Sequence, residues 1–115
     1  MPKKTHQFGL LSEKIATIFL ILKGYQILER RYKTAFGEID IIAKKFNSII
    51  FVEVKARKTA TNIEALLRPT QVKRILKAAE LFIAKNSRFS NHEQRFDFIE
   101  VRGFFSLKHY HNFVS

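Results

Sequence analysis

The sequence predicts a single α/β domain, a mixed five-stranded sheet flanked by helices, in the order α-β-β-β-α-β-β. Three observations support this fold class. The chain has 115 residues, enough for one hydrophobic core and too few for two. Two segments carry apolar residues at helical spacing, and five shorter ones favour strands. Hydrophobic residues make up 46% of the chain, which excludes a disordered or collagen-like protein.

Residues 8–23 are expected to form the first helix, because apolar side chains recur there at helical spacing. These are Leu11, Ile15, Ile18, Phe19 and Leu22. Gly24 follows at the position where a left-handed residue commonly ends a helix. Apolar residues nearly surround the second half, so we expect this helix to be well buried. Residues 1–7 are expected to be a flexible basic lead-in, and residues 8–115 to form the folded domain.

Three strands are expected next, over residues 25–32, 38–43 and 49–55, because these segments combine β-branched and aromatic residues. The turns between them are short, which predicts an antiparallel meander. Residues 57–69 show no clear period and are expected to form a basic loop.

Thr70 is expected to cap the second helix, and Asn86 to end it. Its apolar stripe consists of Val72, Ile75, Leu76, Ala79, Phe82 and Ile83. Residues 95–101 and 104–113 are then expected to be the two closing strands. With them the sheet reaches five strands.

The charge balance points to a polyanionic partner. Lys and Arg number 21 against 10 Asp and Glu, a net charge of +11. Because the basic residues are spread along the chain, they favour a folded basic face over a basic tail. Nucleic acid is therefore the expected partner.

No membrane partner is expected. The apolar run at residues 15–22 is far shorter than the ~20 residues that a membrane helix needs. Zero Cys excludes disulfides and thiolate sites and is compatible with a reducing compartment. We expect a cytoplasmic location.

Alternation along the third strand places Glu53 and Lys55 on one face, roughly 7 Å apart. In the second strand the same rule places Asp40 on one face. The opposite face is expected to carry Ile39, Ile41 and Ala43. If the two strands pair as a hairpin, Asp40 lies beside Glu53. Two carboxylates and an ammonium group suit a hard divalent cation and the cleavage of a phosphodiester.

Two segments carry a family resemblance: GEIDIIA at Gly37–Ala43 and FVEVKAR at Phe51–Arg57. Together they resemble the core of the PD-(D/E)xK nuclease superfamily, which has the restriction-endonuclease-like fold. More narrowly, the chain resembles the YraN-like family, which is similar to Holliday junction resolvases. The resemblance implies a nuclease-like domain over residues 8–115. It also implies a Mg²⁺- or Mn²⁺-dependent endonuclease that cuts branched or structured DNA as a homodimer.

The resemblance also implies roles for individual residues. Asp40 and Glu53 match the metal ligands and Lys55 the catalytic lysine, while Glu13 matches a first-helix glutamate that joins the same catalytic and metal site. Gln71 matches a polar residue near the phosphate. The residues expected to contact nucleic acid are Arg57, Lys58, Arg68, Gln71 and Lys73.

Several alternatives stay open. A non-catalytic DNA- or RNA-binding protein could keep the fold and the basic face, with Asp40, Glu53 and Lys55 as an ion-pair cluster. Glu13 could serve only the positive end of its helix. His109 and His111 form an HxH pattern that can ligate a metal, but the sequence shows no third ligand beside them.

Overall fold

The structure is a computed structural model that describes residues 2–57, 68–103 and 105–113, with side chains described from residue 9 onward. Its elements are α1 (Pro2–Leu22), β1 (Gln26–Lys33), β2 (Glu38–Lys45), β3 (Ser48–Ala56), α2 (Pro69–Lys85), a 3₁₀ turn (Ser87–Phe89), β4 (Glu93–Gly103) and β5 (Ser106–Tyr110). Apart from the 3₁₀ turn, this order confirms the predicted arrangement.

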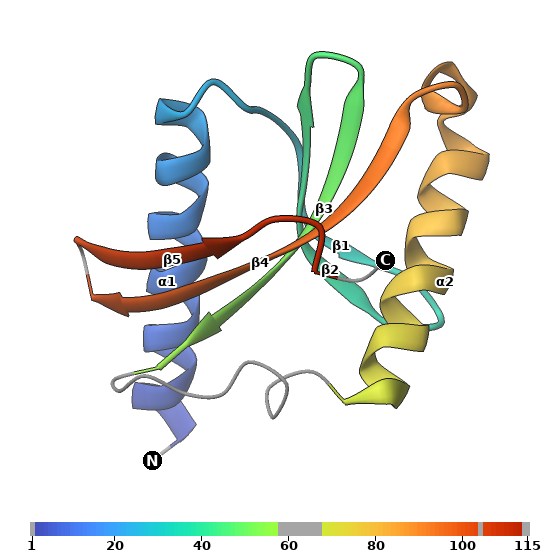
Figure 1. The fold of residues 1–115 in the computed structure, drawn as a ribbon. Coiled ribbons are helices and arrows are strands. Elements are labelled where there is room, and N and C mark those ends of the chain that lie inside the picture. Colours follow the sequence, from blue (N-terminus) through green and yellow to red (C-terminus); the bar gives the residue numbers. More distant parts are fainter. Residues whose placement is uncertain (1, 58–67, 104, 114–115) are drawn as a thin grey trace.

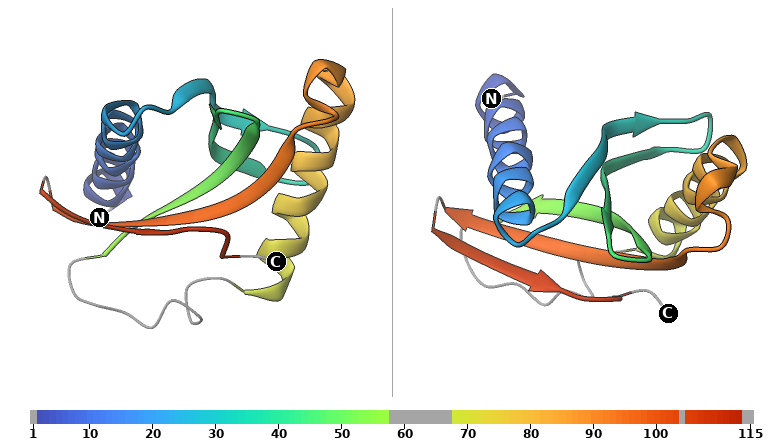
Figure 2. Two further views of the ribbon diagram at one scale, coloured as in Figure 1. Left: turned by 45° about the horizontal axis from the view of Figure 1, so that its top comes forward. Right: turned by 90° about the horizontal axis from the view of Figure 1, so that it is seen from above.

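The strands form one sheet in the order β1-β2-β3-β4-β5. The pairing of β3 with β4 is parallel, and the other three pairings are antiparallel. The sheet is therefore mixed, and β1, β2 and β3 form the expected antiparallel meander. A parallel pair needs a crossover, and α2 supplies it between β3 and β4. Figure 1 shows the sheet between α1 and α2, and Figure 2 shows the two helices on its opposite sides.

Alternation along β3 sends its apolar side chains into two cores. Ile50, Val52 and Val54 pack in the cluster that includes Ala16 and Leu20 of α1. Ile49 and Phe51 pack with Ala78, Ala79 and Phe82 of α2. Since Glu53 and Lys55 follow the parity of Phe51, they emerge on the side of the sheet that α2 covers.

The first helix differs from its prediction in two ways. It begins at Pro2 instead of residue 8, so residues 2–7, expected as a lead-in, are helical. Its second half is not well buried: Ile18, Ile21 and Leu22 are 57%, 53% and 81% exposed. The reason is that α1 meets the sheet along one side only. Neither helix in the described part of the chain is long and apolar enough to cross a membrane.

The predicted ends of the helices are partly confirmed. Gly24 has φ 91° and follows α1, as expected, and the N–H of Tyr25 donates to the carbonyl of Leu20 at 2.9 Å. Asn86 ends α2. Thr70 is not the cap of α2, because it lies inside the helix, which begins at Pro69 with Arg68 at the N-cap position. Proline suits the first helical position, which needs no N–H donor.

The predicted faces of β2 are wrong at one residue. Ile41 and Ala43 share a face, as expected, and pack on the side of α1, but Ile39 packs in the cluster on the side of α2. The alternation therefore breaks at Asp40. Across the ladder Asp40 lies opposite Arg31, which has a left-handed φ of 54°, so both strands are irregular at this level.

Candidate active site

Asp40 lies where β2 separates from β3. The ladder between these strands ends at the pair Ile41 and Val52. Beyond it, the side chain of Asp40 replaces the missing backbone acceptor, because its Oδ2 accepts the N–H of Val54 at 2.8 Å. This bond fixes the carboxylate in the fork between the two strands.

Asp40 and Glu53 meet at the fork. Burial raises the pKa of Asp40 to about 9, and the hydrogen bond and negative charge of Glu53 act in the same direction. The N–H of Val54 and the charge of Lys55 oppose the shift without cancelling it. At neutral pH the two carboxylates therefore share a proton, as two acids in one site do when nothing else balances their charge.

Gln71 in the first turn of α2 reaches the same pair, because its Nε2 donates a hydrogen bond to Oε2 of Glu53. The structure thus brings together three predicted residues: Asp40, Glu53 and Gln71. Lys55 stands two residues beyond Glu53 on the same strand and is close enough for its charge to act on Asp40. The catalytic roles of these residues stay predictions.

Two clefts flank the fork. The one beside α1 has a volume of about 340 Å³, and the one beside the start of α2 has about 320 Å³. The first is lined by Gly9, Glu13, Arg31, Lys33 and Glu38, among others. The second is lined by Glu38, Glu53, Arg68, Gln71 and Arg74, among others. Glu38 lines both, so the clefts adjoin at the start of β2.

Glu13 belongs to the cleft beside α1. Its Oε2 accepts a hydrogen bond from Nε of Arg31 at 2.8 Å, which closes an ion pair between α1 and β1. In the part of the chain that the structure describes, Glu13 does not form a three-ligand group with Asp40 and Glu53. Its role as a metal ligand stays a prediction.

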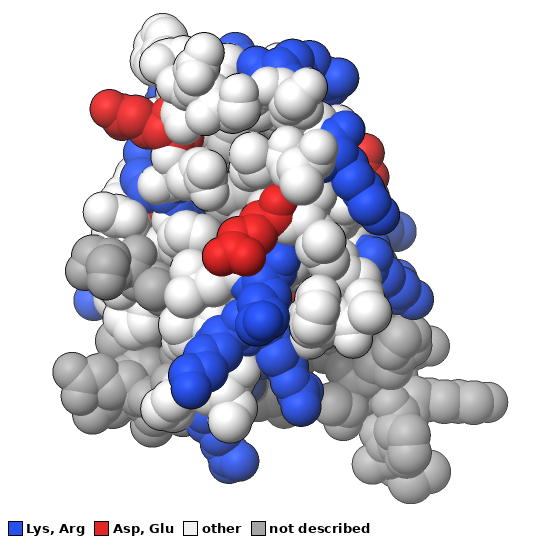
Figure 3. Space-filling model, turned by 90° about the vertical axis from the view of Figure 1, so that its right-hand side faces the viewer, with Lys and Arg blue, Asp and Glu red and all other residues white. Residues whose placement is uncertain are grey.

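The predicted nucleic-acid contacts divide into three groups. Arg68 and Lys73 are exposed at the start of α2, near Gln71. Arg57 directly follows β3 and donates from Nη1 to the carbonyl of Ala56 at 2.8 Å. Lys58 lies outside the described residues. Figure 3 looks onto the side of the molecule that α2 forms and shows Lys and Arg side chains gathered there.

The sequence analysis did not identify an ion pair near Lys55, formed by the buried Glu100 and the partly buried Arg102. Glu100 lies opposite Lys55 in the β3–β4 register and is fully buried. Its Oε1 pairs with Nη2 of Arg102 at 2.7 Å. Glu100 and Arg102 are two positions apart in their strand, a spacing typical of a solvent-exposed strand face. The sequence therefore gave no indication that Glu100 is buried.

A second polar cluster lies on the side of the sheet that α1 covers. Asp97 is buried and accepts hydrogen bonds from Arg95, from the ring of His109 at 2.7 Å and from the N–H of Asn112. Burial alone would raise the pKa of Asp97, but the bonds from His109 and Arg95 outweigh it and lower the pKa to about 2. Ligand atoms of Asp97, His109 and His111 all lie within 4.8 Å of one another, so this group could hold a metal ion. Asp97 is the third candidate ligand that the sequence did not show beside the HxH pattern.

The comparisons with known proteins agree with the sequence motifs. The model of a family described as uncharacterised protein family UPF0102 matches residues 12–101. A UPF0102 protein of Rhodopseudomonas palustris (strain BisB5) is 46% identical over 91 residues, which are 79% of this chain and 70% of that protein. A UPF0102 protein of Rhizobium etli (strain CIAT 652) is 43% identical over 100 residues, 86% of this chain and 81% of that protein. One of Mesorhizobium japonicum is 36% identical over 99 residues, 86% of this chain and 79% of that protein. The YraN-like resemblance is thereby confirmed, and the chain belongs to family UPF0102.

Proposed function

We propose that this protein is a divalent-metal-dependent endonuclease that hydrolyses phosphodiesters in branched or structured DNA. One observation carries the proposal: the Asp40 and Glu53 carboxyl groups meet in a fork of the sheet, beside Lys55 and between two clefts. A protein that only binds phosphate gains nothing from two partly buried carboxylates next to its anionic ligand. A nuclease needs them to hold a cation.

The donors at the fork fit Mg²⁺ or Mn²⁺, because both side chains offer carboxylate oxygens, which hard cations prefer. Asp40 and Glu53 would hold the ion, which when bound supplies positive charge to the phosphate under attack. Gln71 orients Glu53 through its hydrogen bond. In this proposal Lys55 orients the attacking water and stabilises the negative charge that develops on the phosphate.

The direct test is cleavage of labelled single-stranded, duplex, flap and four-way DNA by the purified chain with Mg²⁺ or Mn²⁺. We expect the parent to cut, and Glu53→Gln and Lys55→Ala to lose cleavage by at least about 100-fold. The first variant removes a carboxylate that holds the cation, and the second removes the ammonium group that stabilises the reacting phosphate. Lys44→Ala is the matched control: it removes a lysine whose Nζ bonds the carbonyl of Phe46 in the β2–β3 turn. A parent that binds four-way DNA but never cuts it would contradict the proposal.

The competing function is a non-catalytic nucleic-acid-binding protein, favoured by the exposed basic residues at the start of α2. Both functions predict phosphate-led binding, so log affinity should fall steeply with log salt on duplex DNA. Replacing Arg68 and Lys73 together by Ala should make that slope shallower by about 2, since two phosphate contacts are lost. The measurement is a salt titration of binding to duplexes of unrelated sequence.

The control for the salt titration is the double variant Lys85→Ala and Arg88→Ala. It removes the same charge from exposed residues at the opposite end of α2. An equal change in slope for both double variants would mean that net charge, and not the start of α2, governs binding.

Because a four-way junction requires two symmetric cuts, the proposed active form is a homodimer.

A further inference from the structure

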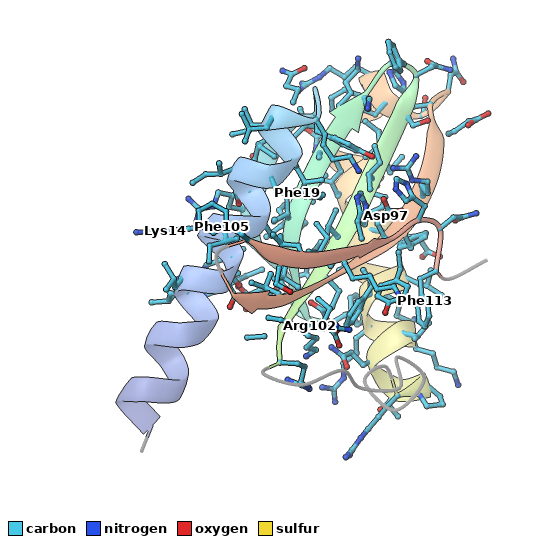
Figure 4. The ribbon with its side chains drawn as sticks, turned by 60° about the vertical axis from the view of Figure 1, so that its left-hand side comes forward. Lys14, Phe19, Asp97, Arg102, Phe105 and Phe113 are labelled. Carbon is cyan, nitrogen blue, oxygen red and sulfur yellow. The ribbon has the colours of Figure 1, made fainter. Side chains whose placement is uncertain are left out.

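We propose that Asp97, His109 and His111 form a binding site for a transition-metal ion of the zinc class. This site is separate from the fork of Asp40 and Glu53. The two sites lie on opposite sides of the sheet, because Glu53 follows the face of α2 whereas His109 packs on Phe19 of α1. Figure 4 labels Asp97 on β4 and Phe19 on α1. His109 bonds the first and packs on the second.

The three ligand atoms lie within 4.8 Å of one another, close enough for a single ion to reach them all. Oδ2 of Asp97 lies 2.7 Å from Nε2 of His109 and 3.9 Å from Nδ1 of His111. In a tetrahedral zinc site with bonds of about 2.0–2.1 Å, neighbouring ligand atoms are roughly 3.3 Å apart. The observed distances lie on either side of this value. Two imidazoles and one carboxylate favour zinc-class ions over Mg²⁺, which prefers oxygen ligands.

The surroundings hold the carboxylate and give access from solvent. Arg95 and the N–H of Asn112 occupy the other positions on the Asp97 oxygens, so the carboxylate is already oriented by hydrogen bonds. The side chain of His109 is 4% exposed and that of His111 is 51% exposed. An ion can therefore enter past the exposed His111, whose ring stacks on that of His109 with the centroids 4.0 Å apart.

Lys23 opposes metal binding and gives the proposal a distinctive consequence. Its Nζ lies 3.4 Å from Nδ1 of His109, and an ammonium group can only donate. In the metal-free protein Nδ1 therefore accepts, and Nε2 carries the proton that bonds Asp97. Once Nε2 binds a metal, the proton of the neutral ring must lie on Nδ1, where it faces the ammonium group. Lys23 is exposed, so it can move away, but its charge lowers the affinity.

The test is a Zn²⁺ titration of the metal-free full chain, with Co²⁺ absorption as the readout of ligand geometry. We expect the parent to bind one Zn²⁺, and His111→Ala to bind roughly tenfold or more weakly. Lys23→Gln should bind several-fold more tightly, because an amide oxygen can accept the proton on Nδ1 of His109. Zn²⁺ should also raise the melting temperature of the parent and not that of His111→Ala, because the ion joins β4 to the turn after β5.

Two controls keep this site distinct from others. His92→Ala removes a histidine that packs on Phe89 just before the start of β4 and should bind Zn²⁺ as the parent does. Glu53→Gln should also bind Zn²⁺ normally, whatever its effect on DNA cleavage. The proposal is overturned if the parent does not bind Zn²⁺, if His111→Ala binds it as the parent does, or if Lys23→Gln binds it more weakly.

Discussion

Replacing Asp40 by Asn should abolish divalent-dependent cleavage and at the same time stabilise the protein. The amide retains both observed roles of the protonated carboxyl: its oxygen can accept the N–H of Val54, and its NH₂ can donate to Glu53. The substitution also removes the carboxylate of Asp40, whose negative charge would be needed to bind a cation. In metal-free buffer we expect the free energy of unfolding to rise by at least about 1 kcal/mol at pH 8.

The pH dependence gives the sign of this effect. Asp40 has a pKa of about 9 in the folded protein and about 3.9 when unfolded. The folded state thus binds the extra proton, and its stability falls as the pH rises from about 4 to about 9. Asp40→Asn lacks this loss, so the two proteins should differ little at pH 4 and most near pH 9.

The measurement is denaturant unfolding of both proteins with a chelator present, at several pH values. Glu80→Gln on the exposed side of α2 makes the same carboxyl-to-amide change and should leave the pH profile unaltered. If Asp40→Asn were less stable than the parent at pH 8, the inference that the fork holds a shared proton at this pH would be wrong. If it were more stable and still cut DNA, the fork would be real but not catalytic.

The second large effect is on the opposite side of the sheet: Asp97→Ala should destabilise the fold by about 3–5 kcal/mol. The side chain of Asp97 is fully buried, and its loss leaves Arg95, His109 and the N–H of Asn112 without their common acceptor. Glu93→Ala, which removes an exposed carboxylate from the same strand, should change stability by less than about 0.5 kcal/mol.

Acid unfolding provides an independent check on Asp97. Its pKa is lowered to about 2, so its contribution is complete above the unfolded value of about 3.9 and is lost as the pH falls toward 2. The parent should therefore lose stability between pH 4 and pH 2 more steeply than Asp97→Ala does. Equal slopes for the two proteins would mean that the buried carboxylate is not ionised in the folded state.

Much of the fold could be predicted because it depends on local patterns. The alternation in β3 and the helical stripe of α2 each record which side of an element is buried. The first is confirmed, and the second is confirmed for Ala79, Phe82 and Ile83 in the second half of the helix. The burial of α1 could not be predicted, since a helix with apolar residues on most sides does not reveal which side meets the sheet. The break in β2 at Asp40 was also hidden, because alternation assumes an unbroken ladder.

The candidate sites show the same division. Asp40 and Glu53 were expected to meet because they stand in one hairpin, and the structure brings them together. Asp97 was not linked to His109 and His111, because that contact depends on how β5 pairs with β4. Arg31 was not linked to Glu13 for the same reason: a loop-separated helix and strand must pack before the ion pair exists.

The position of the fork within the β2–β3 hairpin also bears on how the chain folds. Hairpins close short loops, at a small entropic cost, whereas the β3–β4 pairing must wait until the whole crossover through α2 has been arranged. Asp40 and Glu53 are therefore brought near each other by an early, local event. Gln71 arrives only when α2 docks on the sheet. We therefore expect the acidic pair to form before Gln71 reaches it, so that a nascent or partly folded chain already exposes two carboxylates that a cation can bridge.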